Sequence, residues 1–405
     1  MTKRKFCLVS AFLLLVYGFQ EILFRISFPL PEVLNFNRIN YTNVLLLESE
    51  SPPYQCNTSF VWESKPDGAM SLHHLNLYGF RDRDWKLRPN RGTPRIMFVG
   101  DSFVEGFLAG DTETIPDGFA KESRAKGFPQ ETLNLGIGAS GLPEYCRLVR
   151  DAVPLFSPYC LVLVLYANDF PLQVFDPGWI FPPLHPEQNS SYRPHLLSLL
   201  EFHKSRHTVP RAWHSPPYPF VPPVPDSRNP WSNEEFSTIA QLHVTPNLAK
   251  EMKQGRFNPY AFDTYGVMER MLKIPADATP YLDAINSYTE KHHCELYVVY
   301  LPSCHQVSDA YLPFHSEYSI QKHPKSLQGD AYQTHARELG QACAKLNIPY
   351  LNLTPIIKDH EKNNERLYWK YDEHMRGKGY LLIGKYIYNW IFTKNNQTSL
   401  LSRID

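Results

Sequence analysis

The sequence predicts an α/β fold in which a doubly wound, five-stranded parallel sheet is flanked by helices. Five short runs rich in Val, Ile, Leu and aromatic residues are each bounded by polar residues, Gly or Pro, as strands are. Stretches with the apolar spacing of helices separate these runs. Alternation of strand and helix is typical of parallel strands joined by helical crossovers, and near-continuous apolar runs indicate strands that are buried on both faces.

The predicted strands span residues 95–99, 132–135, 161–166, 295–301 and 348–353. Helical spacing begins at residue 144 and again at residue 330, where Ala336 and Leu339 recur three apart. After the last strand, Leu382, Tyr386 and Trp390 recur four apart. This spacing predicts a closing helix with a broad apolar face.

A proline-rich stretch interrupts the alternation between the third and fourth strands. Residues 171–230 contain 14 of the 35 prolines of the chain. Proline fixes φ and lacks an N–H, so this stretch is neither a helix nor a central strand. We predict a loop-rich insertion over residues 171–258, with a disordered linker as the alternative. The α/β domain then spans 91–392, after an extension over 26–90 and before a tail over 393–405.

The N-terminus has the pattern of a membrane-targeting segment. Lys3, Arg4 and Lys5 precede an uncharged, mostly apolar run over residues 6–19, and no small-x-small cleavage pattern follows. We therefore expect residues 1–25 to form an uncleaved signal anchor, with a buried core helix as the alternative. By the positive-inside rule, residues after Arg25 would then lie outside the cytoplasm, in a periplasmic or extracellular location.

Composition excludes some classes of partner. Lys plus Arg is 41 and Asp plus Glu is 41, so there is no net positive charge to attract nucleic acid. Of the seven cysteines, six follow the N-terminal segment, and an oxidising compartment could pair them in ways that sequence does not determine. No Cys or His grouping has the spacing of zinc ligands, so we expect no metal site. The sequence gives no indication of oligomeric state.

Candidate functional residues follow the predicted strands. In an open parallel sheet, reactive groups gather outside the carboxyl ends of the strands. Residues 100–102 (Gly-Asp-Ser), the glycine-rich turn 136–141 and residues 167–169 (Ala-Asn-Asp) follow the first three strands, and an Asp-x-His lies within 371–380, after the fifth. We expect these four segments to meet at one edge of the sheet.

Together these segments contain the residue types that acyl transfer needs. A serine nucleophile requires a histidine base, and the histidine requires a carboxylate that fixes its tautomer; Ser102, His374 and Asp372 are the candidates. The N–H groups of Ser102, Gly138 or Ala139 and the side chain of Asn168 are candidate oxyanion donors. Each residue also has an ordinary structural interpretation, Ser102 as a helix cap and Asn168 as a turn residue, but their joint occurrence in this order favours a site.

The four segments resemble the sequence blocks of the SGNH/GDSL hydrolase superfamily. "GDSF" resembles the block with the nucleophile, here Ser102; "NLGIGASG" resembles the second block and "YANDF" the third, with Asn168. "YDEHMRGKGY" resembles the last block, with Asp372 and His374. The resemblance extends over roughly residues 70–392 and is greatest to membrane-anchored bacterial members related to polysaccharide O-acetylesterases and O-acetyltransferases.

The chain departs from the family pattern at three points. Ala139 stands where the family has an oxyanion-donating glycine, Tyr166 stands where a glycine two before the asparagine is usual, and Asp-x-His replaces the commoner Asp-x-x-His. An alanine N–H can still donate a hydrogen bond.

The resemblance implies a serine esterase that needs no cofactor and acts on an acylated small molecule or polysaccharide, with acetyl as the expected acyl group. Two alternatives stay open. The same acyl-serine intermediate could pass its acyl group to a sugar hydroxyl, as in an O-acyltransferase. A catalytically silent binding or assembly protein could also keep the sheet without the chemistry, since fold does not determine function.

Overall fold

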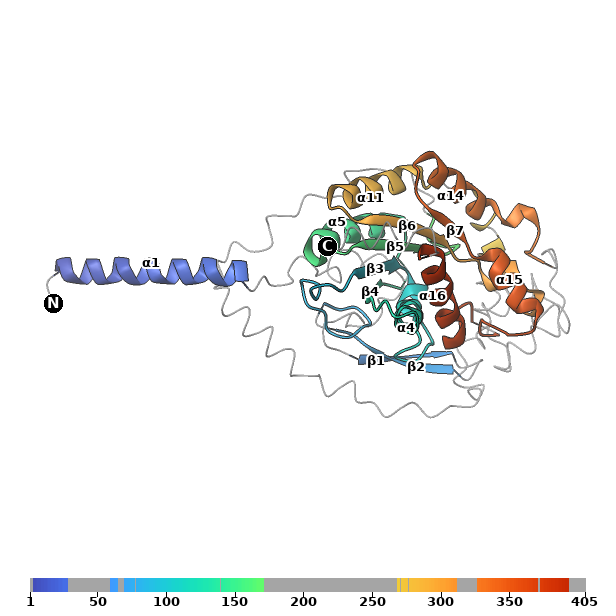
Figure 1. The fold of residues 1–405 in the computed structure, drawn as a ribbon, viewed down its shortest axis with the longest axis horizontal. Helices are drawn as coiled ribbons and strands as arrows, with labels where there is room; N and C mark the ends of the chain where they lie inside the picture. Colours follow the sequence, from blue (N-terminus) through green and yellow to red (C-terminus); the bar gives the residue numbers. More distant parts are fainter. Residues whose placement is uncertain are drawn as a thin grey trace, which may run out of the picture.

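The computed structural model describes residues 3–27, 59–64, 69–76, 78–138, 140–170, 268–269, 271–275, 277–311, 326–370 and 372–392. The predicted insertion over 171–258, the tail over 393–405 and Ala139 lie outside the described residues. Figure 1 shows the arrangement of the described elements around a central sheet.

A five-stranded, all-parallel sheet forms the centre of the molecule, as predicted. Its strands are β3 (Arg95–Gly100), β4 (Glu131–Gly136), β5 (Cys160–Leu165), β6 (Glu295–Tyr300) and β7 (Tyr350–Asn352). The strands lie in the order β4-β3-β5-β6-β7, and every neighbouring pair is parallel. In this doubly wound order the direction of winding reverses beside the first strand, β3, where such folds place their ligands.

Side chains alternate between two apolar cores on the two faces of the sheet. Ile96 and Phe98 of β3 belong to one core, whereas Met97 and Val99 belong to the other. All residues of β3 and β5 are buried. This burial on both faces explains why the strands are near-continuous apolar runs rather than alternating ones.

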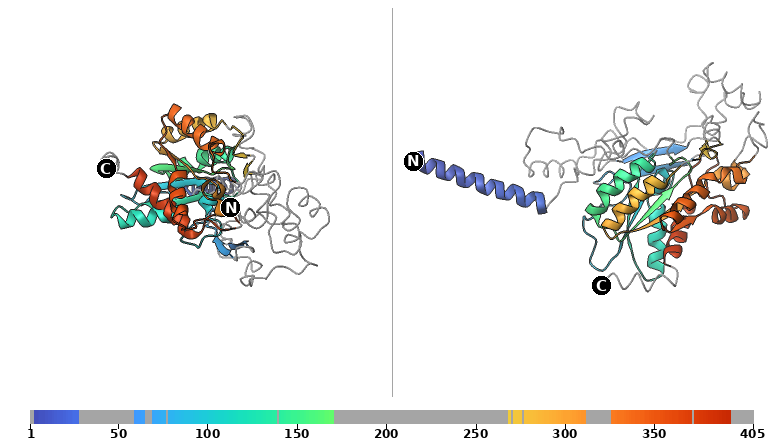
Figure 2. Two further views of the ribbon diagram at one scale, coloured as in Figure 1. Left: turned by 90° about the vertical axis from the view of Figure 1, so that its right-hand side faces the viewer. Right: turned by 90° about the horizontal axis from the view of Figure 1, so that it is seen from above.

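Helices cover both faces, as Figures 1 and 2 show. The core that contains Met97 is closed by α5 (Leu142–Phe156), α11 (Thr279–Lys291) and α14 (Thr334–Lys345). The core that contains Phe98 is closed by α4 (Ile115–Ala125), α15 (Thr354–Lys362) and α16 (Gly377–Ile391). Short helices α3 (Ser102–Glu105), α12 (Cys304–Val307), η5 (Asp309–Tyr311) and η6 (Asp330–Tyr332) lie in the connections.

The closing helix α16 packs directly against α4, with glycines at the contact. A Cβ atom on Gly384 would overlap the carbonyl oxygen of Ile115, and one on Gly118 would overlap the backbone of Leu381. The backbones of the two helices therefore touch where side chains would otherwise separate them. This contact fixes α16, and with it the segment just before it, against the body of the domain.

An antiparallel hairpin that the sequence did not predict lies beside the parallel sheet. It consists of β1 (Ser59–Ser64) and β2 (Ala69–His74). After it, Tyr78, Phe80 and Trp85 are buried in the same core as β4 and α5. Tyr78, Phe80 and Trp85, which lie within the extension that we predicted over 26–90, thus pack in the same core as the sheet.

The N-terminal segment forms a single helix, α1 (Lys3–Ser27), which Figure 1 shows apart from the sheet. Among the helices of the described ranges, none combines the length and the apolar character needed to cross a membrane. The anchor over residues 1–25 therefore stays a prediction. Five cysteines in the described part of the chain are buried and free of disulfides: Cys146, Cys160, Cys294, Cys304 and Cys343.

Candidate active site

Ser102 lies at the turn from β3 into α3, where the sheet order reverses. Asp101 caps α3, because its carboxylate accepts the N–H of Phe103 at 2.9 Å. Glycines at the ends of β3 and β4 let α3 lie against the strand ends: a Cβ atom on Gly100 would overlap Val104, and one on Gly136 would overlap the backbone of Glu105. The sequence thus places the serine hydroxyl at the carboxyl edge of the sheet.

Asp372 and His374 lie in a short hairpin just before α16. Tyr368 and Met375 form an antiparallel bridge across its base, and the N–H of Trp369 donates to the carbonyl of His374 at 3.0 Å. The N–H of His374 in turn donates to Asp372 Oδ1 at 2.8 Å. These contacts within the hairpin hold Asp372 and His374 in a fixed relative position.

The structure brings Ser102, His374 and Asp372 together in one chain of hydrogen bonds. His374 Nε2 lies 2.8 Å from Ser102 Oγ, and His374 Nδ1 lies 2.6 Å from Asp372 Oδ1. With the proton on Nδ1, the ring donates to the carboxylate and accepts from the serine hydroxyl. The Asp-x-His spacing therefore allows the contact between Asp372 and His374.

Aromatic rings surround the imidazole of His374. The rings of Phe103 and Phe107 each lie 5.0 Å from it, centroid to centroid. Tyr166 stacks on Phe103 at 4.0 Å, and its hydroxyl donates to Glu373 Oε2 at 3.0 Å. Tyr166, which stands two residues before Asn168, thus connects the turn after β5 to the hairpin that carries His374.

The electrostatics of the site favour a charged His374. Burial opposes the charge, but the Asp372 carboxylate, its hydrogen bond and the acidic groups Glu373 and Asp101 raise the pKa of His374 to about 9. Burial also opposes the charge of Asp372, yet His374 holds the pKa of Asp372 below its usual value. Burial raises the pKa of Asp101, the cap of α3, to about 7.

The expected oxyanion donors differ in their surroundings. The N–H of Ser102 belongs to the first residue of α3, so it has no partner within that helix. Asn168 lies in the turn after β5 with an exposed side chain. The N–H of Gly138 donates to Glu105 Oε2 at 2.9 Å, so the donor that we expected from Gly138 is already bound to a carboxylate. Ala139, the other candidate of this turn, lies outside the described residues.

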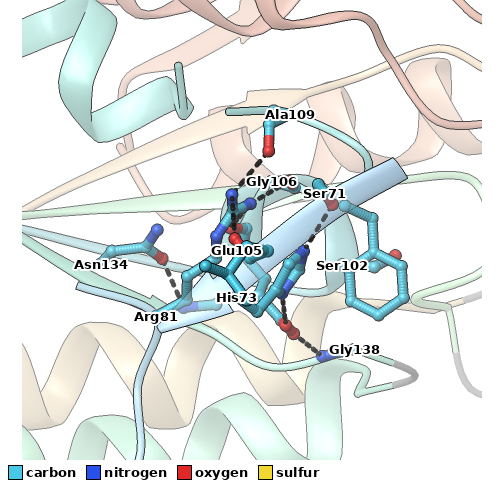
Figure 3. Close-up of polar contacts among 12 residues, drawn as sticks. Ser71, His73, Arg81, Ser102, Glu105, Gly106, Ala109, Asn134 and Gly138 are labelled. Carbon is cyan, nitrogen blue, oxygen red and sulfur yellow. Dashed lines mark hydrogen bonds and ion pairs between the residues drawn. The ribbon is translucent and has the colours of Figure 1, made fainter. Parts of the chain in front are cut away.

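A buried polar cluster beneath the site was missing from the sequence-based prediction. Figure 3 shows Glu105 between His73 of β2 and Gly138, with Arg81 beside it. The available signal was the carboxylate of Glu105 within the apolar run "SFVEGF". His73 could not be found in the same way, because its role depends on the unpredicted β1–β2 hairpin.

Within the described residues, no group of three or more His, Cys, Asp or Glu side chains is placed to hold a metal ion. Every group of the Ser102–His374–Asp372 chain is already hydrogen-bonded to another member of it. His374, held by Asp372, can therefore take the proton from the Ser102 hydroxyl.

Comparison with known proteins yields distant structural similarities. No protein-family model and no curated protein sequence matches the chain. The structure is similar to a lipase/acylhydrolase from Enterococcus faecalis, with 11% identity, a TM-score of 0.37 and coverage of 74% of this chain and 95% of that one. It is also similar to a gut microbial diltiazem-metabolizing enzyme, with 10% identity, a TM-score of 0.32 and coverage of 76% and 48%. A third similar structure is a two-domain esterase active on acetylated mannans, with 12% identity, a TM-score of 0.32 and coverage of 77% and 50%. At such low similarity, the function has to be inferred from the residues of the site.

Proposed function

We propose that this protein is a serine hydrolase of the SGNH/GDSL type that removes acyl groups, acetyl above all, from a carbohydrate or envelope substrate. One observation carries the proposal. The hydroxyl of Ser102, the imidazole of His374 and the carboxylate of Asp372 form one hydrogen-bonded chain, with contacts of 2.8 Å and 2.6 Å. This is the arrangement that activates a serine as a nucleophile.

The proposed reaction has two steps. Ser102 Oγ attacks the ester carbonyl while its proton moves to His374 Nε2; the alcohol then leaves with that proton, and an acyl-Ser102 remains. Water next attacks the acyl group, gives one proton to His374, and releases the acid as the proton returns to Ser102. Asp372 holds the imidazole through Nδ1 and stabilises its charge in both steps.

The tetrahedral intermediates need hydrogen-bond donors. We propose the N–H of Ser102 and the side chain of Asn168 for this role, with Ala139 as a further donor. Loss of one such donor typically lowers kcat by about 10²- to 10³-fold. Asn168→Ala is therefore expected to lower kcat while the protein stays folded.

A fluorophosphonate probe tests the proposal directly, because it labels activated serines without knowledge of the substrate. We expect labelling at Ser102, identified by peptide mapping, and loss of labelling in Ser102→Ala and His374→Ala. Thermal unfolding of both variants controls for folding. An unlabelled wild-type protein, or equal labelling of wild type and His374→Ala, would contradict the proposal and favour a catalytically silent binding protein.

Hydrolysis and acyl transfer differ in the molecule that accepts the acyl group. The acyl-Ser102 intermediate can react with water or with a sugar hydroxyl, and the same three residues serve both. Incubation with p-nitrophenyl acetate, with and without a glycan acceptor, distinguishes them. We expect free acetate in both cases; an acetylated glycan would identify an O-acyltransferase instead.

We also propose that the site faces a compartment outside the cytoplasm and that residues 1–25 anchor the chain. The basic residues before the apolar run at the N-terminus support this placement. External protease applied to intact cells, with any outer envelope opened, tests it. A fully protected chain would reject the placement.

A further inference from the structure

The carboxylate of Glu105 connects two segments that are distant in the sequence. Glu105 belongs to α3, three residues after Ser102, and is fully buried. Its Oε1 atom lies 2.9 Å from His73 Nδ1, and its Oε2 atom accepts the N–H of Gly138 at 2.9 Å. Figure 3 shows this carboxylate between β2 and the loop after β4. The helix of the nucleophile and the turn expected to bind the oxyanion are thereby joined through one side chain.

His73 reaches the cluster from β2 with both ring nitrogens engaged. Its Nε2 atom lies 3.1 Å from Ser71 Oγ, and the ring is fully buried. Burial lowers the pKa of His73 despite the opposing hydrogen bond with Glu105. With its proton on Nδ1, the neutral ring donates to Glu105 and accepts from the Ser71 hydroxyl.

His73 also contacts the aromatic cluster of the active site. Its ring meets the ring of Phe107 edge-on, with centroids 5.4 Å apart. Phe107 stacks in turn on His374. A continuous series of contacts thus leads from Gly138 through Glu105 and His73 to the proposed catalytic base.

Arg81 holds the backbone around the same carboxylate. This buried guanidinium donates to the carbonyls of Glu105 at 3.3 Å, Ala109 at 2.6 Å and Gly106. Gly106 ends α3 in the left-handed region at φ 86°, where a side chain would be strained and would meet Thr114 and Arg81. The positive charge of Arg81 lies near enough to Glu105 to interact with it electrostatically.

We propose that Glu105 is a positioning residue, which holds the Gly138 peptide and hence the loop after β4 at a fixed place relative to Ser102. The inference rests on the proposed acyl-transfer function. Glu105 bonds to His73 and Gly138 rather than to the reacting atoms, so it acts through the loop. Displacement of a catalytic group by about 1 Å can lower a rate by about 10²-fold, so a loosened loop would slow the chemistry without weakening substrate binding.

Two substitutions of Glu105 test whether its hydrogen bonds position the loop or whether its side chain only fills space in the core. Glu105→Leu keeps a side chain of similar size and removes both hydrogen bonds. Glu105→Gln can still accept the N–H of Gly138 and can donate to His73 Nδ1, once the ring adopts its other tautomer and donates to Ser71. We expect Glu105→Leu to lower kcat by roughly 30- to 100-fold with KM within about threefold, and Glu105→Gln to keep kcat within about threefold.

A matched control lies at the amino ends of β3 and β4, opposite the carboxyl ends near Ser102. Glu131, at the start of β4, accepts a hydrogen bond from Arg95 Nε at 3.0 Å. Glu131→Leu and Glu131→Gln disturb a part-buried carboxylate far along the strand from Ser102. Both are expected to keep kcat and KM for p-nitrophenyl acetate unchanged, whatever they do to the thermal unfolding temperature.

The outcomes for the inference and for the proposed function are distinguishable. A wild-type protein that the fluorophosphonate does not label removes the proposed function. A labelled wild type combined with unchanged kcat in Glu105→Leu overturns only the positioning role, as does an equal loss in Glu105→Leu and Glu105→Gln. If Glu105→Leu does not fold, the His73→Phe variant decides. This variant keeps a ring against Phe107 but loses the hydrogen-bond donor to Glu105, so its kcat should fall about three- to tenfold. An unchanged kcat in His73→Phe would overturn the inference.

Discussion

The Nε2 atom of His374 lies 2.8 Å from the Oγ atom of Ser102, although 272 positions separate the two residues in the chain. Two features produce this contact. Ser102 follows the strand beside which the winding of the sheet reverses, and His374 lies in a closed hairpin immediately before α16. The contact therefore depends on the packing of α16 as much as on the turn after β3.

The pH dependence of the reaction should follow the titration of His374. A base accepts the serine proton only when its ring is neutral, and the pKa of His374 is raised to about 9. We expect kcat/KM for p-nitrophenyl acetate, corrected for spontaneous hydrolysis, to rise through neutral pH and level off above about pH 9. A profile that is already flat above about pH 7 would contradict this expectation.

Asp372→Asn should slow the reaction strongly while leaving the fold intact. The amide lacks the negative charge that stabilises the imidazolium, and its NH₂ group can favour the wrong tautomer of His374. The Asp372→Asn substitution is expected to lower kcat by about 10²- to 10⁴-fold. The midpoint of the pH profile should also move down towards the ordinary histidine value.

Asp277→Asn is the control for that substitution. Asp277 accepts the N–H of Thr279 at 2.9 Å at the start of α11, on the other side of the sheet from α16. The Asp277→Asn variant should keep the wild-type kcat and pH profile. Equal losses in the two variants would indicate a general effect on the fold rather than a role for Asp372.

Asp101 should make the folded state less stable as pH rises. Burial raises the pKa of Asp101 from 3.8 to about 7, so between these values the folded chain keeps a proton that the unfolded chain has lost. The free energy of unfolding of the wild type, relative to that of Asp101→Asn, should therefore be highest below about pH 4 and fall up to about pH 7. Denaturant titrations at several pH values measure this difference, which a constant offset between the two proteins would contradict.

Gly384→Ala should destabilise the protein by separating α16 from α4. The added methyl group would overlap the carbonyl oxygen of Ile115, and overpacking of this kind costs about 1–3 kcal/mol. The unfolding temperature should fall, and activity should fall with it, because α16 follows the hairpin of His374. Gly329→Ala is the control, since its Cβ atom would meet nothing within 4 Å at an ordinary φ of −72°.

Much of the sheet follows from local patterns. The five apolar runs became β3 to β7, with most ends within one residue of the prediction, because strands buried on both faces need apolar residues at nearly every position. The short β7 is the largest deviation: residues 350–352 pair with β6, whereas the prediction spanned 348–353. At the sheet edge, fewer residues of the apolar run find a partner strand.

The sequence predicted those site residues whose side-chain chemistry and order along the chain both indicate acyl transfer. Ser102, Asp372 and His374 are residue types with a recognisable joint use; the end of β3 positions Ser102, and the hairpin before α16 brings Asp372 and His374 to it. Glu105 and His73 were missed because a buried Glu–His pair becomes visible only when β2 is placed against α3. The engagement of the Gly138 N–H by Glu105 was missed for the same reason, since sequence does not tell which way a peptide group points.

The packing of α16 on α4 has a consequence for the order of events during synthesis. Ser102 and its strand leave the ribosome early, but the hairpin with His374 and the helix that holds it come from the last part of the described chain. Contacts between distant segments form late, after the local ones. In a nascent chain, Ser102 therefore lacks its histidine partner until the hairpin and α16 have been synthesised and α16 has packed against α4.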